Sequence, residues 1–309
     1  MKKILSILTS VIILTTSLGF AGCQSKPKQT EPIKFGLLPA ESAIPFIVAK
    51  EQGFFEKEGL NVELTMFNSP NDRNAAIQGK LFDGTIADVM TALSLNDGGF
   101  KMKITSDINE DFKLLTSPNS GIDTFQKLDK KDVSLVPNFV LEYIMDKMAE
   151  KNNITYSVVN IPSIPARFEA ILADKISGVV FTEPQATQLK EKGAKVLASS
   201  KEYNIKAGAV IFDENTIKNN AEGVKAFYRA YNKAVELINT ESVETYGSYL
   251  NKYTFSDTIK NYLGSGAKYE KAGAIPKETF EDVLKWTKTK NTVKNDYKYE
   301  DIGNFNFIK

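Results

Sequence analysis

Short apolar runs alternate with amphipathic stretches along the first two thirds of the chain. Strands are predicted at residues 33–38, 60–66 and 84–87, with helices between them at 43–52 and 69–79. Serine followed by proline opens the second of these helices, and glycine closes both, which are typical start and stop signals. Because strands and helices alternate with short loops, the pattern predicts an α/β fold with largely parallel sheets.

The same strand–helix–strand pattern occurs twice, 94 residues apart. Shifted by this distance, residues 59–89 align with 153–183 without a gap, and Arg73 falls on Arg167. Few of the aligned positions are identical, so an internal repeat or a coincidence of two similar units explains the match. In either case the chain is predicted to build this unit twice.

Two further strands, predicted at 111–117 and 207–212, flank the second unit. We interpret them as the passages that link two lobes. Lobe 1 is therefore expected to comprise 33–118 and 207–309, and lobe 2 to comprise 119–206. Such an arrangement places a ligand cleft between the lobes.

The last third of the chain is predicted to be helical. Apolar residues recur at helical spacing over 221–239, and further helices are expected at 257–263 and 276–288. Trp286 in the last of these is either a core residue or a platform for a ligand, and its spacing favours the core.

The N-terminus has the features of an export signal. Two lysines precede an apolar run over 4–18, and small residues precede Cys23, the single cysteine of the chain. This arrangement resembles the lipobox of bacterial lipoproteins, in which the cysteine is lipidated. We expect a signal peptide at 1–22 and a polar tether at 23–32; the alternative is an ordinary signal peptide with an incidental cysteine.

Composition narrows the classes of function. Removal of residues 1–22 leaves 37 Lys plus Arg against 38 Asp plus Glu, so the net charge of about −1 argues against nucleic acid as a partner. The absence of histidine removes the commonest general base and transition-metal ligand. A non-enzyme without a metal or cofactor is therefore expected. Arginine occurs only three times against 36 lysines, which draws attention to where it is used.

Candidate ligand contacts come from the rule that α/β proteins bind solutes at the carboxyl ends of strands and at helix N-termini. The rule selects Pro39, Glu41, Ser69, Asn71, Arg73, Asp88, Asn138, Arg167, Thr182 and Glu183.

Each candidate also has a structural explanation. Ser69 and Asn138 are potential helix caps, and the two arginines have Asp72 and Glu169 nearby as partners on a solvated helix face. Glu183 is the favoured ligand contact because the proline after it restricts the backbone at the end of a strand.

Three segments resemble the solute-binding proteins of ABC transporters. They are Leu37-Leu38-Pro39 followed by residues 49–64 (AKEQGFFEKEGLNVEL), residues 75–84 (AAIQGKLFDG), and Phe181-Thr182-Glu183-Pro184. The branch is the SsuA-like and ThiY-like one, whose members bind aliphatic sulfonates, taurine, nitrate or thiamine pyrimidine precursors. The resemblance covers most of residues 33–290.

The resemblance implies a two-lobe, periplasmic-binding-protein-like α/β fold of type 2. It further implies a monomeric, extracytoplasmic lipoprotein on the outer face of the membrane, which captures a small molecule for an ABC permease and its ATPase. A lipoprotein that reports its ligand to a membrane receptor is the alternative. An enzyme of thiamine-pyrimidine synthesis fits less well, because such members use histidine and a cysteine-rich motif that this chain lacks. Acidic candidates such as Glu41, Asp88 and Glu183 favour a neutral or cationic heteroaromatic ligand over a sulfonate.

Overall fold

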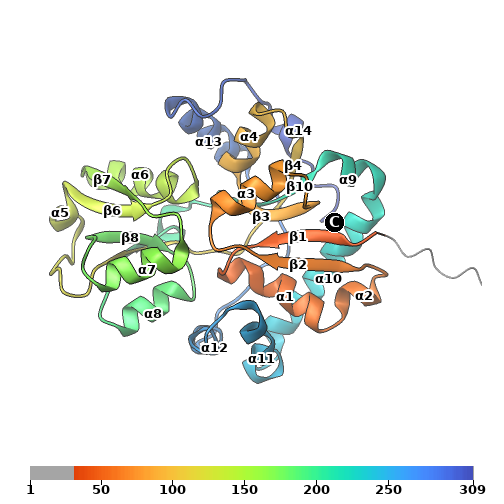
Figure 1. Ribbon diagram of the computed structural model, residues 1–309, viewed down its shortest axis with the longest axis horizontal. Coiled ribbons are helices and arrows are strands. Elements are labelled where there is room, and N and C mark those ends of the chain that lie inside the picture. Colours follow the sequence, from red (N-terminus) through yellow and green to blue (C-terminus); the bar gives the residue numbers. More distant parts are fainter. Residues whose placement is uncertain (1–30, 309) are drawn as a thin grey trace, which may run out of the picture. The chain divides into compact units, whose positions relative to one another are not determined.

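The computed structural model describes residues 31–308, so the predicted signal peptide, Cys23 and nearly all of the tether lie outside the described residues. Two five-stranded sheets form the centres of two lobes (Figure 1). The first has the order β2-β1-β3-β10-β4, with strands Val62–Met66, Ile33–Leu37, Gly84–Asp88, Gly208–Asp213 and Met102–Asp107. The second has the order β7-β6-β8-β5-β9, with strands Tyr156–Asn160, Lys131–Leu135, Gly178–Phe181, Lys113–Thr116 and Lys195–Ser199.

The repeated strand–helix–strand unit is confirmed. In lobe 1 it consists of β2, α3 (Pro70–Gln78) and β3, and in lobe 2 of β7, α7 (Ile164–Leu172) and β8. The first residues of all three elements are 94 positions apart in the two lobes. Both helices begin after a capping serine whose hydroxyl accepts a backbone N–H of the first turn, which explains why the punctuation repeats.

Each sheet also contains one antiparallel strand. β10 pairs with β3 in lobe 1, and β5 pairs with β8 in lobe 2. Both strands therefore belong to a sheet, and the passages between the lobes lie directly before them. The expected boundary at residue 118 is wrong, because β5 belongs to lobe 2. The chain crosses from lobe 1 between the end of β4 at Asp107 and the start of β5 at Lys113.

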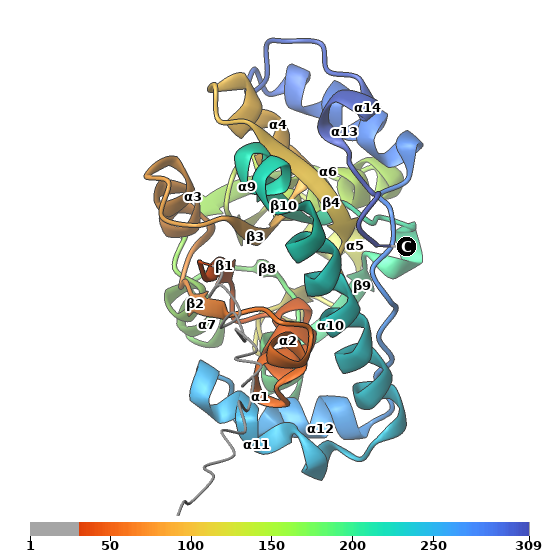
Figure 2. The same cartoon turned by 90° about the vertical axis from the view of Figure 1, so that its right-hand side faces the viewer.

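An aromatic cluster fills the core of lobe 1. The ring of Phe227 lies 5.0 Å from that of Phe35, 5.1 Å from that of Phe55 and 5.5 Å from that of Phe46. These rings join β1 to helices α1 (Ile44–Glu51), α2 (Phe54–Lys57) and α10 (Ala221–Thr240), which lie together on one face of the sheet (Figure 2). Their burial supplies a large hydrophobic contribution and fixes the sheet that carries one wall of the site.

The C-terminal helix α13 (Lys277–Thr289) contacts both lobes, although the sequence assigned it to lobe 1. It packs on α4 (Val89–Asp97) of lobe 1 and on α6 (Val140–Asn152) of lobe 2. Trp286 is buried, as expected of a core residue, and its indole N–H donates to Asp146 at 2.9 Å.

The remaining helices complete the two lobes. They are α5 (Phe125–Leu128), α8 (Gln185–Glu191), α9 (Glu214–Asn219), α11 (Gly247–Leu250), α12 (Thr258–Gly264) and α14 (Tyr299–Ile302). Within residues 31–308, no helix has the length and apolar character needed to span a bilayer.

Candidate functional site

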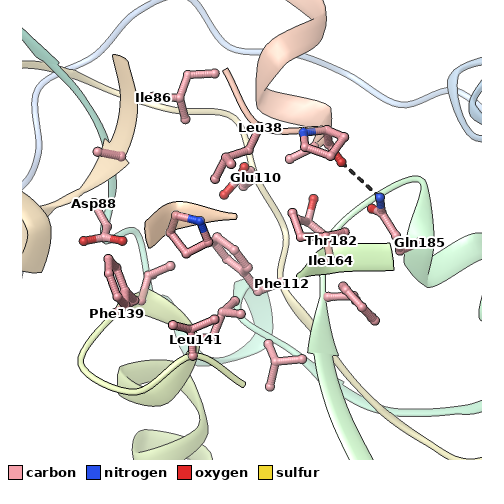
Figure 3. A pocket seen from close by; sticks show the side chains of 18 of the residues that line it. Leu38, Ile86, Asp88, Glu110, Phe112, Phe139, Leu141, Ile164, Thr182 and Gln185 are labelled. Atoms are coloured by element: carbon pink, nitrogen blue, oxygen red, sulfur yellow. Dashed lines mark hydrogen bonds between the residues drawn. The ribbon is translucent and has the colours of Figure 1, made fainter. Parts of the chain in front are cut away.

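A cavity of about 650 Å³, including its open mouth, lies between the two lobes (Figure 3). Its walls come from the ends of β1, β3 and β8 and from the first turns of α3, α6 and α7. Two of the hydrogen bonds between the lobes lie beside it. Gln185 Nε2 donates to the carbonyl oxygen of Pro39 at 3.1 Å, and the amide of Ile164 donates to the carbonyl oxygen of Asn68, also at 3.1 Å. The cavity is therefore enclosed by both lobes.

Most of the lining is apolar. Fourteen of the lining residues carry apolar side chains, among them Phe112, Phe139 and Phe181, and six carry polar ones. The polar six are Arg73, Asp88, Glu110, Arg167, Thr182 and Gln185. A ligand with a mainly apolar body and a small polar part suits such walls.

Arg73 is almost fully buried and held by its own lobe. Its Nη1 donates to the carbonyl of Ile86 at 3.0 Å, and its Nε and Nη2 donate to the side-chain oxygen of Asn74. Burial lowers the pKa of this guanidinium, and nearby Asp88 and Glu110 oppose that shift.

Arg167 occupies the equivalent position in lobe 2 but has fewer partners. Its Nη1 donates to the carbonyl of Ile161 at 2.9 Å, and the guanidinium carbon lies 4.8 Å from the centre of the Phe181 ring. Its buried Nε has no hydrogen-bond acceptor among the described residues. Burial lowers the pKa of Arg167 to about 10, so the side chain stays charged at neutral pH.

The alternative that both arginines pair with neighbouring acids on a solvated face is wrong. Both side chains are buried, 2% and 3% exposed, and line the cavity instead. Within residues 31–308 neither makes an ion pair with Asp72 or Glu169.

Two acids line the cavity beside the arginines. Asp88 caps α4, and its Oδ1 accepts the amide of Thr91 at 2.7 Å. Glu110, in the crossing between β4 and β5, hydrogen-bonds to Ser42 at 2.5 Å. Burial, with the charges of Glu41 and Asp88, raises the pKa of Glu110 to about 8, so its carboxyl is mostly protonated at pH 7.

Glu41 and Glu183 do not line this cavity. Glu183, the favoured candidate, is 2% exposed; its Oε1 lies 2.9 Å from Lys113 Nζ and its Oε2 accepts the amide of Thr187. Burial opposes the charged form of Lys113, but Glu183 and Glu41 outweigh it and raise the pKa of the lysine. The carboxylate before this proline therefore belongs to an internal ion pair and does not line the cavity.

Glu41 holds the junction between the lobes together. Its carboxyl accepts the amide of Asp111 at 2.5 Å and the hydroxyls of Tyr262 and, at 3.4 Å, Thr182. Burial raises the pKa of Glu41 to about 7. Its partners come from lobe 1, lobe 2 and the crossing, which explains why it is buried without facing the cavity.

Three further candidates also lie outside the lining. Ser69 caps α3 by accepting the amide of Asp72, and Asn71 is exposed on the same helix. Asn138 precedes α6 but is not its cap: the N-cap is Phe139, and the amide of Asn138 donates to Glu142. Pro39 and Thr182 do line the cavity, as do Asp88 and the two arginines.

Glu110, Phe112, Phe139 and Gln185 are lining residues that the sequence analysis missed. Glu110 and Phe112 belong to the crossing between the lobes; Glu110 lies just before the strand predicted at 111–117, and Phe112 lies within it. The crossing itself could have identified them as lining residues, because a chain segment that passes between two lobes borders the space between those lobes. In residues 31–308 no group of three or more His, Cys, Asp or Glu side chains is arranged to hold a metal ion.

Several solved structures have a similar fold. A ligand-binding component of an ABC-type import system from Staphylococcus aureus superposes with a TM-score of 0.77, covering 90% of this chain and 98% of that one at 14% identity. The alkanesulfonate-binding protein SsuA of Xanthomonas axonopodis pv. citri, bound to MOPS, gives 0.76 over 89% and 98% at 12% identity. The nitrate-binding protein NrtA of Synechocystis PCC 6803 gives 0.71 over 86% and 83% at 16% identity. The chain therefore has a periplasmic-binding-protein-like fold.

Residues 41–243 match the family described as NMT1/THI5 like, and the chain belongs to this family. A Saccharomyces cerevisiae protein named 4-amino-5-hydroxymethyl-2-methylpyrimidine phosphate synthase THI11 is 24% identical over 246 residues, which cover 73% of this chain and 71% of that protein. The chain is thus similar in fold to SsuA-like binding proteins and in sequence to a relative that has the name of an enzyme.

Proposed function

We propose that this protein is the solute-binding component of an ABC importer. It captures a small solute between its lobes and hands it to a membrane permease and its ATPase. The observation that carries the proposal is a mainly apolar cavity whose polar side chains come from both lobes and from the crossing between them. Such a site is complete only when the lobes are together, which couples solute capture to a change in the protein's outer surface.

The location follows from the N-terminus. A basic start, an apolar run and Cys23 after small residues support export, cleavage and lipidation at the cysteine. One lipid chain binds membranes weakly, so stable anchoring at the outer face requires the two or more acyl chains of a bacterial lipoprotein.

Binding without turnover is the simplest use of this cavity. Its lining contains no histidine or cysteine, and the two acids are engaged in a helix cap and in a hydrogen bond to Ser42. The enzyme function in the name of the yeast relative is the alternative. A melting screen of the purified protein against pyrimidines, sulfonates, nitrate, amino acids and carboxylates separates the two functions. A binding protein gives a solute-dependent rise in Tm, and chromatography recovers the solute unchanged.

Transport and sensing are separated by uptake. Cells that lack this protein should lose uptake of the radiolabelled solute while keeping the permease. Unchanged uptake, with loss of a solute-dependent response, would instead favour the ligand-sensing lipoprotein.

A further inference from the structure

Arg167 is a buried cation that the protein itself does not neutralise. It is 3% exposed, its nearest named contacts are a carbonyl oxygen and an aromatic ring, and no ion pair to it occurs among the described residues. A buried charge without a counter-charge is costly, and a buried donor without an acceptor adds to that cost. The missing acceptor is therefore expected to arrive with the ligand.

The charged side chains that line the cavity also favour an anionic ligand. The lining contains the guanidiniums of Arg73 and Arg167 and, against them, the two carboxyls of Asp88 and Glu110. Glu110 is mostly protonated because burial and neighbouring acids raise its pKa to about 8. The ligand-free cavity thus carries an excess of about one positive charge, which a single negative charge balances.

Helix α6 provides a second donor at the same cavity. Its N-cap residue Phe139 makes no side-chain capping bond, whereas the side chains of Ser69 and Asp88 cap α3 and α4. Phe139, Val140 and Leu141 all line the cavity, so the uncapped first turn of this 13-residue helix borders the ligand space. Figure 3 shows Phe139 and Leu141 directed into that space. An anionic group is stabilised at such a helix terminus.

The walls limit the kind of anion. Apolar side chains such as Ile86, Phe112 and Val180 surround most of the space, so an inorganic anion would leave them uncovered. A planar carboxylate matches the fork of Arg167, whose buried Nε has no acceptor among the described residues. A sulfonate brings a third oxygen that needs a donor of its own, and the hydroxyl of Thr182, which borders this space, already donates to Glu41. The expectation that the acidic candidates select a neutral or cationic ligand is not supported, because Glu41 and Glu183 do not line the cavity and Asp88 is engaged as the cap of α4.

We propose that the solute is a small monocarboxylate with an apolar, aromatic or branched body, bound through Arg167. This inference rests on the proposed binding function and specifies its ligand class. The carboxylate accepts from the guanidinium of Arg167 and lies near the first turn of α6. The apolar body packs against the phenylalanines of the cavity.

Calorimetric titration of the purified protein with three matched probes tests the ligand class. Benzoate carries the carboxylate, benzamide is its uncharged counterpart and benzenesulfonate its tetrahedral counterpart; phenylacetate and 3-methylbutanoate vary the body. The carboxylates should bind at least tenfold more tightly than benzamide and benzenesulfonate. Equal affinity for the amide or the sulfonate, or no measurable binding of any carboxylate, would overturn the inference.

Arg167→Gln tests the contact, with Arg229→Gln as the matched control, since Arg229 is exposed and pairs with Glu58 on the surface. Arg167→Gln should weaken carboxylate binding ten- to a hundredfold, leave benzamide binding unchanged and leave the ligand-free Tm unchanged or higher. Full carboxylate affinity in this variant would overturn the contact. If the variant fails to fold, the comparison of carboxylate with amide on the unaltered protein still decides. Binding of a pyrimidine or nitrate but no carboxylate would refute this inference and leave the importer function standing.

Discussion

Replacing Glu110 with Gln should remove a large part of the pH dependence of this protein's stability. The carboxyl of Glu110 is buried beside Glu41 and Asp88, and this environment raises its pKa from 4.5 to about 8 in the folded state. In the unfolded chain the group has its ordinary pKa. Folding therefore retains a proton that the unfolded chain releases at any pH between these two values.

The sign and size of the effect follow from linkage. The stability that the protonated Glu110 contributes is fully present below about pH 4.5 and is lost as the pH rises through about 8. Each pH unit in this window costs about 1.4 kcal/mol, so the loss between pH 5 and pH 8 is about 4 kcal/mol. Glu41, whose pKa is raised to about 7, adds a loss of the same sign over a narrower window.

Urea unfolding of the ligand-free protein at pH 5, 6, 7 and 8 measures this directly. The unaltered protein should lose stability steadily over that range, and Glu110→Gln should lose roughly half as much, because Glu41 still titrates. Glu244→Gln, at an exposed position, should keep the full slope. A flat or rising stability in the unaltered protein, or an unchanged slope in Glu110→Gln, would refute the argument.

Three further changes probe the fold and the anchor. Lys113→Met leaves Glu183 buried without its cation, so the free energy of unfolding should fall by about 3 kcal/mol in urea. Gly84→Ala places a methyl group 2.8 Å from the ring of Phe212 and 2.9 Å from a backbone oxygen, so calorimetry should show a loss of about 2 kcal/mol. Cys23→Ala should move the protein from the membrane fraction to the soluble fraction, as fractionation and immunoblotting detect.

Matched changes control for these effects. Lys127→Met removes an exposed ion pair and should change the free energy of unfolding by no more than about 0.5 kcal/mol. Gly264→Ala meets its nearest neighbouring atom at 3.9 Å and should be close to neutral. If Lys113→Met is as mild as Lys127→Met, the ion pair at Glu183 contributes little. If the unaltered protein is soluble and cleaved at another site, the lipid anchor is refuted.

Local signals explain why much of the fold was predictable. The capping serine, the proline and the closing glycine of α3 act within a few residues of each other, and α7 repeats the capping serine. The predicted bounds of both copies of the unit therefore lie within two residues of the bounds in the structure. The strands that pair with β5 were not predictable from such local signals. β5 pairs with β8 and β9, both more than 60 residues further along the chain, and its own sequence is compatible with either sheet.

For the candidate site too, features set by the local sequence were predictable, and features set by contacts between distant residues were not. Arg73 and Arg167 were found because a rare residue recurs at equivalent points, whereas their burial arises only in the folded chain. Glu183 was expected to contact the ligand, but its partner Lys113 lies 70 residues away in the sequence and takes up its charge. Glu110 lies just before the strand predicted at 111–117, and its altered pKa arises from neighbours that only the folded chain brings together.

The most direct test of the account is native mass spectrometry of the protein after incubation with the small-molecule fraction of a cell extract. The account predicts one bound solute per chain, released on denaturation with an unchanged mass and carrying a single negative charge at neutral pH. A protein that binds nothing from the fraction, or that releases a product differing in mass from the solute it took up, would contradict it.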